Sequence, residues 1–122
     1  MVGAQAIVHL KTGKLQHSNH ENVELWPNVF SAIQAIVNCV TSPHQDPGAV
    51  PTMYDLLLSI GTQTSARIEM EDIRTTFNYT PGTAVLICGR VLLHAVPTWE
   101  DGERICLAHY MRDMIHDRLE LE

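Results

Sequence analysis

Short apolar or alternating stretches, separated by clusters of turn residues, make up most of this sequence. Polar and apolar residues alternate in Arg67–Met70 and in Thr75–Thr80, which is typical of strands with one buried face. Proline and glycine lie between such stretches, as at Pro81-Gly82, and favour turns. In chain order, the strands and apolar runs that we predict are Ala6–Leu10, Ser31–Val40, Met53–Ile60, Arg67–Met70, Thr75–Thr80, Thr83–Gly89, Arg90–Val96 and Arg104–Tyr110.

Many short strands at this spacing predict an all-β barrel or a two-sheet jelly roll. The last stretch, Met111–Glu122, differs because its apolar residues recur at helix-like intervals. We therefore expect one domain over residues 1–122, all-β or β-rich α+β, with a jelly-roll barrel and a short C-terminal helix. Such a barrel suits a functional site, since ligands on separate rigid strands can converge on one point.

Composition and charge narrow the class of protein. Apolar residues make up 45% of the chain and charged residues 18%, as in an ordinary folded domain. The net charge of −6 argues against a sequence-independent grip on DNA, but not against an enzyme that takes one base into a pocket. No signal peptide or membrane-spanning run is visible. Cys39, Cys88 and Cys106 lack disulfide or metal spacing, so we expect buried free thiols in a reducing compartment, nuclear or cytoplasmic.

His44 and Asp46 are the first candidates for chemistry. Two residues apart in an extended segment, they project to the same side and could hold one cation. His94 ends a later apolar run and adds a second imidazole. Two histidines and one carboxylate form the facial triad of non-haem Fe(II) oxygenases, which leaves metal positions open for a co-substrate and O2. The simpler interpretations are a turn pair for His44 and Asp46 and a core histidine for His94.

Arg104 opens an apolar strand, ten residues after the second histidine. Its guanidinium can pair two oxygens at once, which suits the far carboxylate of a dicarboxylic co-substrate. An exposed ion pair with the acidic loop before it is the alternative interpretation. Cys106 shares the strand face of Arg104, and Asn38 has the strand parity of His44, so both could line a co-substrate pocket.

Four segments carry a resemblance to a known family: Asn38–Asp46, Tyr79–Thr83, Gly89–His94 and Gly102–Asp113. In this order and spacing they resemble the Fe(II)- and 2-oxoglutarate-dependent oxygenases, in particular the TET/JBP-like domains of mushroom-forming fungi. The resemblance covers roughly the last two-thirds of the chain. It implies the double-stranded β-helix, a cupin-like form of the jelly roll.

The resemblance also implies roles for individual residues. His44, Asp46 and His94 would bind Fe(II), and Arg104 would bind the C5 carboxylate of the co-substrate 2-oxoglutarate. Many of these enzymes carry a hydroxyl residue two positions after the arginine. This chain has Cys106 there, whose thiol is a weaker donor.

The reaction that the resemblance implies is hydroxylation of a C–H bond, with consumption of 2-oxoglutarate and O2. The TET/JBP group oxidises 5-methylpyrimidines, so the implied substrate is the methyl group of 5-methylcytosine or thymine, flipped out of nucleic acid. Two alternatives stay open: a catalytically impaired copy that acts as a binding or assembly module, and a hydroxylase of proteins or small molecules. Cys106 and the short stretch before His44 favour the impaired copy, whereas the complete set of histidines, aspartate and arginine favours an enzyme.

Overall fold

The computed structural model describes residues 29–112, which form eight strands and no helix. All strand pairs are antiparallel. In chain order the strands are β1 (Ala32–Val37), β2 (Thr41–His44), β3 (Asp55–Gly61), β4 (Arg67–Met70), β5 (Thr75–Asn78), β6 (Ala84–Ile87), β7 (His94–Val96) and β8 (Arg104–Tyr110). The predicted strands Arg67–Met70 and Arg104–Tyr110 are confirmed with the same bounds.

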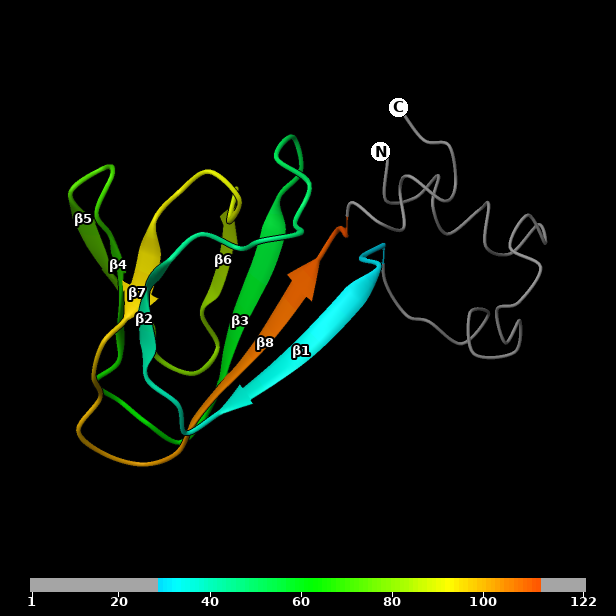
Figure 1. Ribbon diagram of the computed structural model, residues 1–122. Helices are drawn as coiled ribbons and strands as arrows, with labels where there is room; N and C mark the ends of the chain where they lie inside the picture. Colours follow the sequence, from blue (N-terminus) through cyan, green and yellow to red (C-terminus); the bar gives the residue numbers. More distant parts are fainter. Residues whose placement is uncertain (1–28, 113–122) are drawn as a thin grey trace, which may run out of the picture.

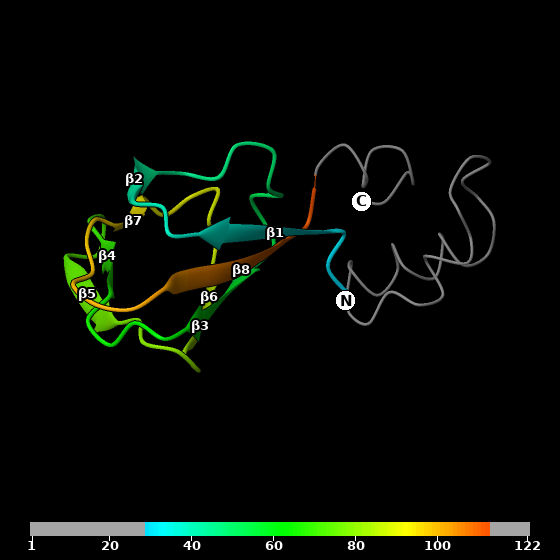
Figure 2. The same ribbon diagram turned by 90° about the horizontal axis from the view of Figure 1, so that it is seen from below.

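The strands form two four-stranded sheets (Figure 1). One sheet has the order β1-β8-β3-β6, and the other has the order β2-β7-β4-β5. The first strand thus pairs with the last, the second with the seventh, the third with the sixth and the fourth with the fifth. This nested pairing defines a jelly roll, so the predicted double-stranded β-helix fold is confirmed. Figure 2 shows the two groups of strands from below.

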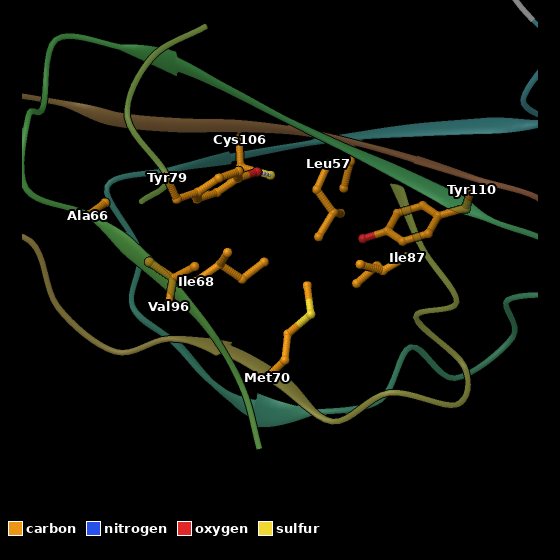
Figure 3. Packing of buried hydrophobic residues seen from close by; sticks show 10 residues of the cluster. Leu57, Ala66, Ile68, Met70, Tyr79, Ile87, Val96, Cys106 and Tyr110 are labelled. Atoms are coloured by element: carbon orange, nitrogen blue, oxygen red, sulfur yellow. Dashed lines mark hydrogen bonds between the residues drawn. The ribbon is translucent and has the colours of Figure 1, made fainter. Parts of the chain in front are cut away.

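The hydrophobic core fills the space between the two sheets (Figure 3). In β4, buried Ile68 and Met70 alternate with exposed Arg67 and Glu69, as the alternating pattern predicts. Both sheets contribute inward side chains, and the core consists of Leu57, Ala66, Ile68, Met70, Tyr79, Ile87, Val96, Cys106, Ala108 and Tyr110. The core therefore fixes the register of both sheets, because a slip by one residue would turn these side chains outward.

The predicted single strand Ser31–Val40 is wrong in its extent. β1 ends at Val37, and Asn38 adopts a φ of 50°, a left-handed conformation that asparagine tolerates better than most residues. The chain then crosses to the other sheet and continues as β2. The apolar pattern could not reveal this crossing, because the segments on both sides of it contain β-branched, strand-forming residues.

The two apolar runs around Gly89 form shorter strands than we predicted. β6 ends at Ile87 and β7 begins only at His94. Between them the chain turns, and the carbonyl of Cys88 accepts hydrogen bonds from the backbone N–H groups of Val91 and Leu92, both at 2.9 Å. This turn connects β6 in one sheet with β7 in the other, and His94 is the first residue of β7.

Two predicted elements cannot be compared with the structure. The strand Ala6–Leu10 and, apart from its first two residues, the helix Met111–Glu122 lie outside the described residues. Arg112 forms an isolated antiparallel bridge with Ala49. Within residues 29–112, no helix has the length and apolar character needed to cross a membrane.

The three cysteines are free thiols, as predicted. Their predicted burial is correct only for Cys106. Cys39 is exposed and Cys88 is half-buried. Cys39 lies in the connection between β1 and β2, and Cys88 lies in the connection between β6 and β7. In both connections the chain passes from one sheet to the other, so their apolar residues are not part of a buried strand.

Candidate metal centre

Three side chains that are distant in the sequence meet where β2 pairs with β7. His44 ends β2, His94 begins β7, and the two residues are partners in the strand register. Their ring centroids lie 4.3 Å apart. Asp46, two residues beyond His44, turns its carboxylate toward both rings. The ligand atoms of the three residues lie within 4.8 Å of one another, so together they could hold one metal ion.

Backbone carbonyls set the orientation of both imidazole rings. Nδ1 of His44 lies 2.8 Å from the carbonyl oxygen of Ser42, and Nδ1 of His94 lies 2.9 Å from that of Leu92. Because a carbonyl only accepts, Nδ1 carries the hydrogen in each neutral ring and Nε2 presents its lone pair. These Nε2 atoms lie 3.2 Å (His44) and 3.6 Å (His94) from the two carboxylate oxygens of Asp46. This donor set fits a divalent cation such as Fe(II).

The centre is buried on the His94 side and accessible on the His44 side. The side chain of His94 is 5% exposed, whereas that of His44 is 36% exposed. Burial lowers the pKa of His94, although the Leu92 carbonyl and the Asp46 carboxylate partly oppose this shift. His94 is therefore neutral near pH 7, which is the form that binds a metal.

A second buried carboxyl group, that of Asp55, lies beside the centre. Asp55 begins β3 and is 1% exposed. A Cβ atom placed on Gly89 would overlap Oδ2 of Asp46 and would lie 2.5 Å from Oδ2 of Asp55. Gly89 therefore makes room for both carboxyl groups. Burial and then the charge of Asp46 raise the pKa of Asp55 to about 6, and the backbone N–H groups of Gly89 and Met111 and the Arg112 guanidinium oppose this in part.

Arg104, the first residue of β8, points into the same interior. It is 2% exposed and lines a cavity between the sheets together with His44 and His94. One terminal nitrogen donates to the carbonyl of Cys39, whereas Nε has no hydrogen-bond partner among the described residues. A buried cation with a spare donor suits an anionic ligand. Such burial excludes the alternative of an exposed ion pair with the acidic loop.

Cys106 lies on the same face of β8 as Arg104 and contacts Tyr79. Sγ of Cys106 and the hydroxyl oxygen of Tyr79 are 3.2 Å apart in the cavity wall (Figure 3). Burial raises the pKa of both groups, so both keep their protons near pH 7. The cavity has a volume of about 20 Å³, room for roughly one water molecule. A ligand the size of 2-oxoglutarate therefore requires side chains in this wall to move.

Asn38 does not line this cavity, contrary to the sequence-based expectation. It is exposed, and its Oδ1 accepts a hydrogen bond from the backbone N–H of Arg104 at 2.9 Å. Its own N–H donates to the carbonyl of Arg104 at 2.8 Å. Asn38 thus holds the start of β8 through the backbone. The parity argument failed because the strand ends at Val37, so Asn38 and His44 do not belong to one strand.

Sequence reasoning missed Asp55, Gly89 and Tyr79 as parts of the site. A carboxylate that opens an apolar run, as Asp55 does, is a weak signal of a buried polar role. Gly89 and Tyr79 belong to segments that carry the family resemblance, but no local pattern assigns them a position. Their place near the centre results from the pairing of strands that are distant in the sequence.

Two histidines and one carboxylate inside a jelly roll, with a buried arginine in the same cavity, are the features of a non-haem iron oxygenase domain. The comparison of the sequence with protein families agrees. The chain belongs to the Tet_JBP family, the oxygenase domain of the 2OGFeDO superfamily, whose family model matches residues 9–113. The comparison with curated protein sequences gives no match.

Among solved structures, twelve chains match. One of them is described as NgTET1 in complex with 5mC DNA, with a TM-score of 0.66 and 15% sequence identity. The match covers 84% of this chain and 41% of that chain, so this chain spans less than half the length of NgTET1. At this identity the match supports the fold.

Proposed function

We propose that this domain is an Fe(II)- and 2-oxoglutarate-dependent dioxygenase that hydroxylates a C–H bond. The observation that carries the proposal is the convergence of His44, Asp46 and His94, whose ligand atoms lie within 4.8 Å of one another. Two of these ligands share a cavity with the buried Arg104. Membership in the 2OGFeDO superfamily supports iron and 2-oxoglutarate over other metals and co-substrates.

Each side chain has a defined task in this proposal. The Nε2 atoms of both histidines and the carboxylate of Asp46 would hold the iron, and the backbone carbonyls behind the rings keep those nitrogens aimed at one point. Arg104 would bind the far carboxylate of 2-oxoglutarate through its spare donor. With O2, the bound iron and 2-oxoglutarate would supply the oxidising chemistry. The apolar walls of the cavity, such as Leu57 and Ile68, keep water from the reacting atoms.

The proposed substrate is the methyl group of 5-methylcytosine or thymine in nucleic acid. Membership in the Tet_JBP family and the fold shared with NgTET1, which is described in complex with 5mC DNA, support this choice. A methyl group within a duplex would have to be flipped out of the stack to reach the centre. Because the chain carries a net charge of −6, its own attraction to phosphates would be weak, and additional binding surface would have to come from elsewhere.

A catalytically impaired module is the second candidate. The narrow cavity of about 20 Å³ and the thiol of Cys106 at a position near Arg104 favour it. A hydroxylase of proteins or small molecules would use the same centre and would differ only at the substrate-facing rim.

Anaerobic titration with Fe(II) and 2-oxoglutarate separates these candidates. We expect the weak visible charge-transfer band that arises when both bind together. The band should be absent in His94→Ala and should require far more 2-oxoglutarate in Arg104→Ala. Arg67→Ala removes an exposed arginine on β4 and is the matched control that should keep the band. A well-folded protein without any band would favour the impaired module.

The substrate is tested separately, with oligonucleotides that contain 5-methylcytosine or thymine. Mass spectrometry of the digested DNA after incubation with Fe(II), 2-oxoglutarate and O2 should show the hydroxymethyl base. The His94→Ala protein is the control. Succinate formation without any oxidised base would support the centre but contradict this substrate.

A further inference from the structure

Tyr79 has a buried hydroxyl to which the proposed function gives no task. The residue is 0% exposed and belongs to the core, and it lines the same cavity as His94 and Arg104. Among residues 29–112, the hydroxyl forms its only hydrogen bond with Sγ of Cys106, at 3.2 Å (Figure 3). A thiol is a weak donor and a weak acceptor, so the hydroxyl of Tyr79 lacks a partner of its own strength.

Hydrogen bonds at the backbone hold Tyr79 in place. Its carbonyl oxygen accepts from Oγ of Ser59 at 2.9 Å and from Nε2 of Gln63 at 2.8 Å. Its N–H donates to the carbonyl of Ala66 at 2.9 Å. Ser59 and Gln63 are themselves 0% exposed. The backbone of Tyr79 is therefore anchored inside the molecule, and the ring carries its hydroxyl into the cavity from a rigid support.

Arg104 also lacks a strong partner in this cavity. Its side chain is buried, and Nε has no hydrogen-bond partner. The guanidinium forms no ion pair with the carboxylates in the part of the chain that the structure describes. Burial of an unpaired charge is costly, so an anion that enters the cavity would be bound strongly at this point.

The Tyr79 hydroxyl and the Arg104 guanidinium lie at the same end of the cavity. Cys106, which the hydroxyl contacts, is two residues after Arg104 on the same face of β8, about 7 Å along the strand. The charge of Arg104 partly opposes the rise in the pKa of Tyr79 that burial causes, which agrees with a short separation. One carboxylate can accept from both groups, because its two oxygens offer four lone pairs.

Two other hydroxyl residues, Thr41 and Tyr110, line the cavity. Tyr110 is six residues after Arg104, about 20 Å further along β8. Burial and then the charge of Asp46 raise the pKa of Tyr110, so this hydroxyl lies toward the candidate metal centre. Thr41 is only half-buried, so its hydroxyl can reach water. Tyr79 is thus the fully buried hydroxyl beside Arg104.

We propose that Tyr79 is a binding residue for the co-substrate, whose far carboxylate accepts hydrogen bonds from the Tyr79 hydroxyl and the Arg104 guanidinium together. This inference rests on the proposed function, since it concerns the co-substrate of the same site. The exchange of partners favours binding, because the hydroxyl loses a weak contact with the Cys106 thiol and gains a charged acceptor.

Two ligands that differ only in the far carboxylate test this role. 2-Oxobutanoate has the 2-oxo acid end of 2-oxoglutarate but a hydrogen in place of the far carboxylate. Anaerobic titration in the presence of Fe(II) gives the apparent Kd of each ligand. We expect Tyr79→Phe, which keeps the ring and removes the hydroxyl, to weaken 2-oxoglutarate binding at least about ten-fold. The Kd of 2-oxobutanoate should change by less than about two-fold, because this ligand has no group for the hydroxyl to bind.

The controls separate a lost hydrogen bond from a damaged protein. Tyr54→Phe removes a hydroxyl from a residue that is 66% exposed, and it should keep both Kd values. Thr41→Val removes the half-buried hydroxyl of the cavity wall and should also keep them. Binding of 2-oxobutanoate by Tyr79→Phe shows that the metal centre of this variant is intact.

A measurement on the unaltered protein does not depend on the folding of any variant. A tyrosine that donates to a carboxylate absorbs at longer wavelength than one that contacts a thiol. With Mn(II) bound, we expect 2-oxoglutarate to produce a tyrosine difference band at longer wavelength and 2-oxobutanoate to produce none. The same band with both ligands would assign the change to Tyr110 near the metal centre and would contradict the role of Tyr79.

The outcomes distinguish this inference from the proposed function. Equal affinity for 2-oxoglutarate in Tyr79→Phe and in the unaltered protein would overturn the role of Tyr79 alone, as would a loss of affinity in Thr41→Val instead. No charge-transfer band in the unaltered protein with either ligand would overturn the proposed function and the role of Tyr79 with it.

Discussion

Nε2 of His44 lies 3.2 Å from Oδ1 of Asp46, although in the ring orientation set by the Ser42 carbonyl both atoms are acceptors. Two acceptors at this distance repel unless a proton or a cation lies between them. Nε2 of His94 lies 3.6 Å from the other carboxylate oxygen of Asp46, and this second pair of acceptors also needs a proton or a cation between its atoms. One cation at the shared point satisfies all three groups, whereas one proton satisfies only one pair.

A divalent cation should therefore stabilise the folded protein. Mn(II), which resists oxidation, should raise the melting temperature, and at a hundred times its Kd it should add about 2.7 kcal/mol to the free energy of unfolding. Asp46→Ala should abolish this gain, while the control Asp101→Ala, which removes an exposed carboxylate, should keep it. Differential scanning fluorimetry with and without Mn(II) measures both. Equal gains in the two variants would contradict a site at Asp46.

Gly89→Ala should damage the metal centre through lack of space. The new Cβ would overlap Oδ2 of Asp46 and crowd Asp55, so we expect at least ten-fold weaker metal binding in a folded protein. Gly82→Ala is the contrasting variant. Its Cβ would meet nothing within 4 Å, but its φ of +92° strains alanine, so it should cost about 1 kcal/mol of stability and leave metal affinity unchanged. Isothermal titration calorimetry with Mn(II) distinguishes the two effects.

Asp55 should make stability depend on pH in the metal-free protein. Its pKa is raised from 3.8 to about 6, so the neutral form is favoured in the folded state. The stabilising contribution is complete below pH 3.8 and is lost as the pH rises through about 6. Asp55→Asn keeps the shape without the charge and should gain stability over the unaltered protein, by an amount on the order of 2 kcal/mol, between pH 4 and pH 7.5.

Urea unfolding of both proteins in the presence of a chelator measures this difference. The comparison cancels the titration of His44 and His94, which both proteins share. A stability difference that stays constant from pH 4 to pH 7.5 would show that burial beside Asp46 does not alter the pKa of Asp55.

Cys106→Ser should strengthen the binding of 2-oxoglutarate several-fold. A hydroxyl is a better donor than a thiol, and this position lies on the same face of β8 as Arg104. Cys106→Ala, which has no donor, should weaken binding or leave it unchanged. Anaerobic titration in the presence of Fe(II) gives the apparent Kd of each protein. Tighter binding in the alanine variant than in the serine variant would indicate that volume, and not hydrogen bonding, limits the cavity.

Asn38 should matter for stability and not for the co-substrate. Asn38→Gly keeps the left-handed φ of 50° but loses the hydrogen bond to the Arg104 N–H, which should cost about 1 kcal/mol. Asn38→Ala loses both features and should cost more. Chemical unfolding ranks the two variants, and the 2-oxoglutarate titration should give the same Kd for both as for the unaltered protein. A weaker Kd in Asn38→Gly would restore the original expectation of a pocket residue.

Sequence patterns predicted a strand correctly where the pattern depends only on the residues of that strand and on their burial. β4 alternates strictly because one of its faces packs on the core, and a period of two residues is readable along the chain. β8 could be predicted because it is a short run of mainly apolar residues after a turn. The candidate ligands His44, Asp46 and His94, together with Arg104, could also be singled out, since metal and carboxylate chemistry limits the residue types and their order. The sequence thereby determined the fold class and the candidate chemistry.

Tertiary structure alone decided where the chain changes sheets and what surrounds the centre. The break at Asn38, the turn before His94 and the approach of Asp55 to Asp46 across Gly89 all depend on which strands pair. Strand pairing brings together residues that are tens of positions apart, and no local period encodes that choice. The same reason applies to the outer faces of the two sheets, because only the strand register shows that the outer face of the β1-β8-β3-β6 sheet is mainly apolar and that of β4 and β5 is polar.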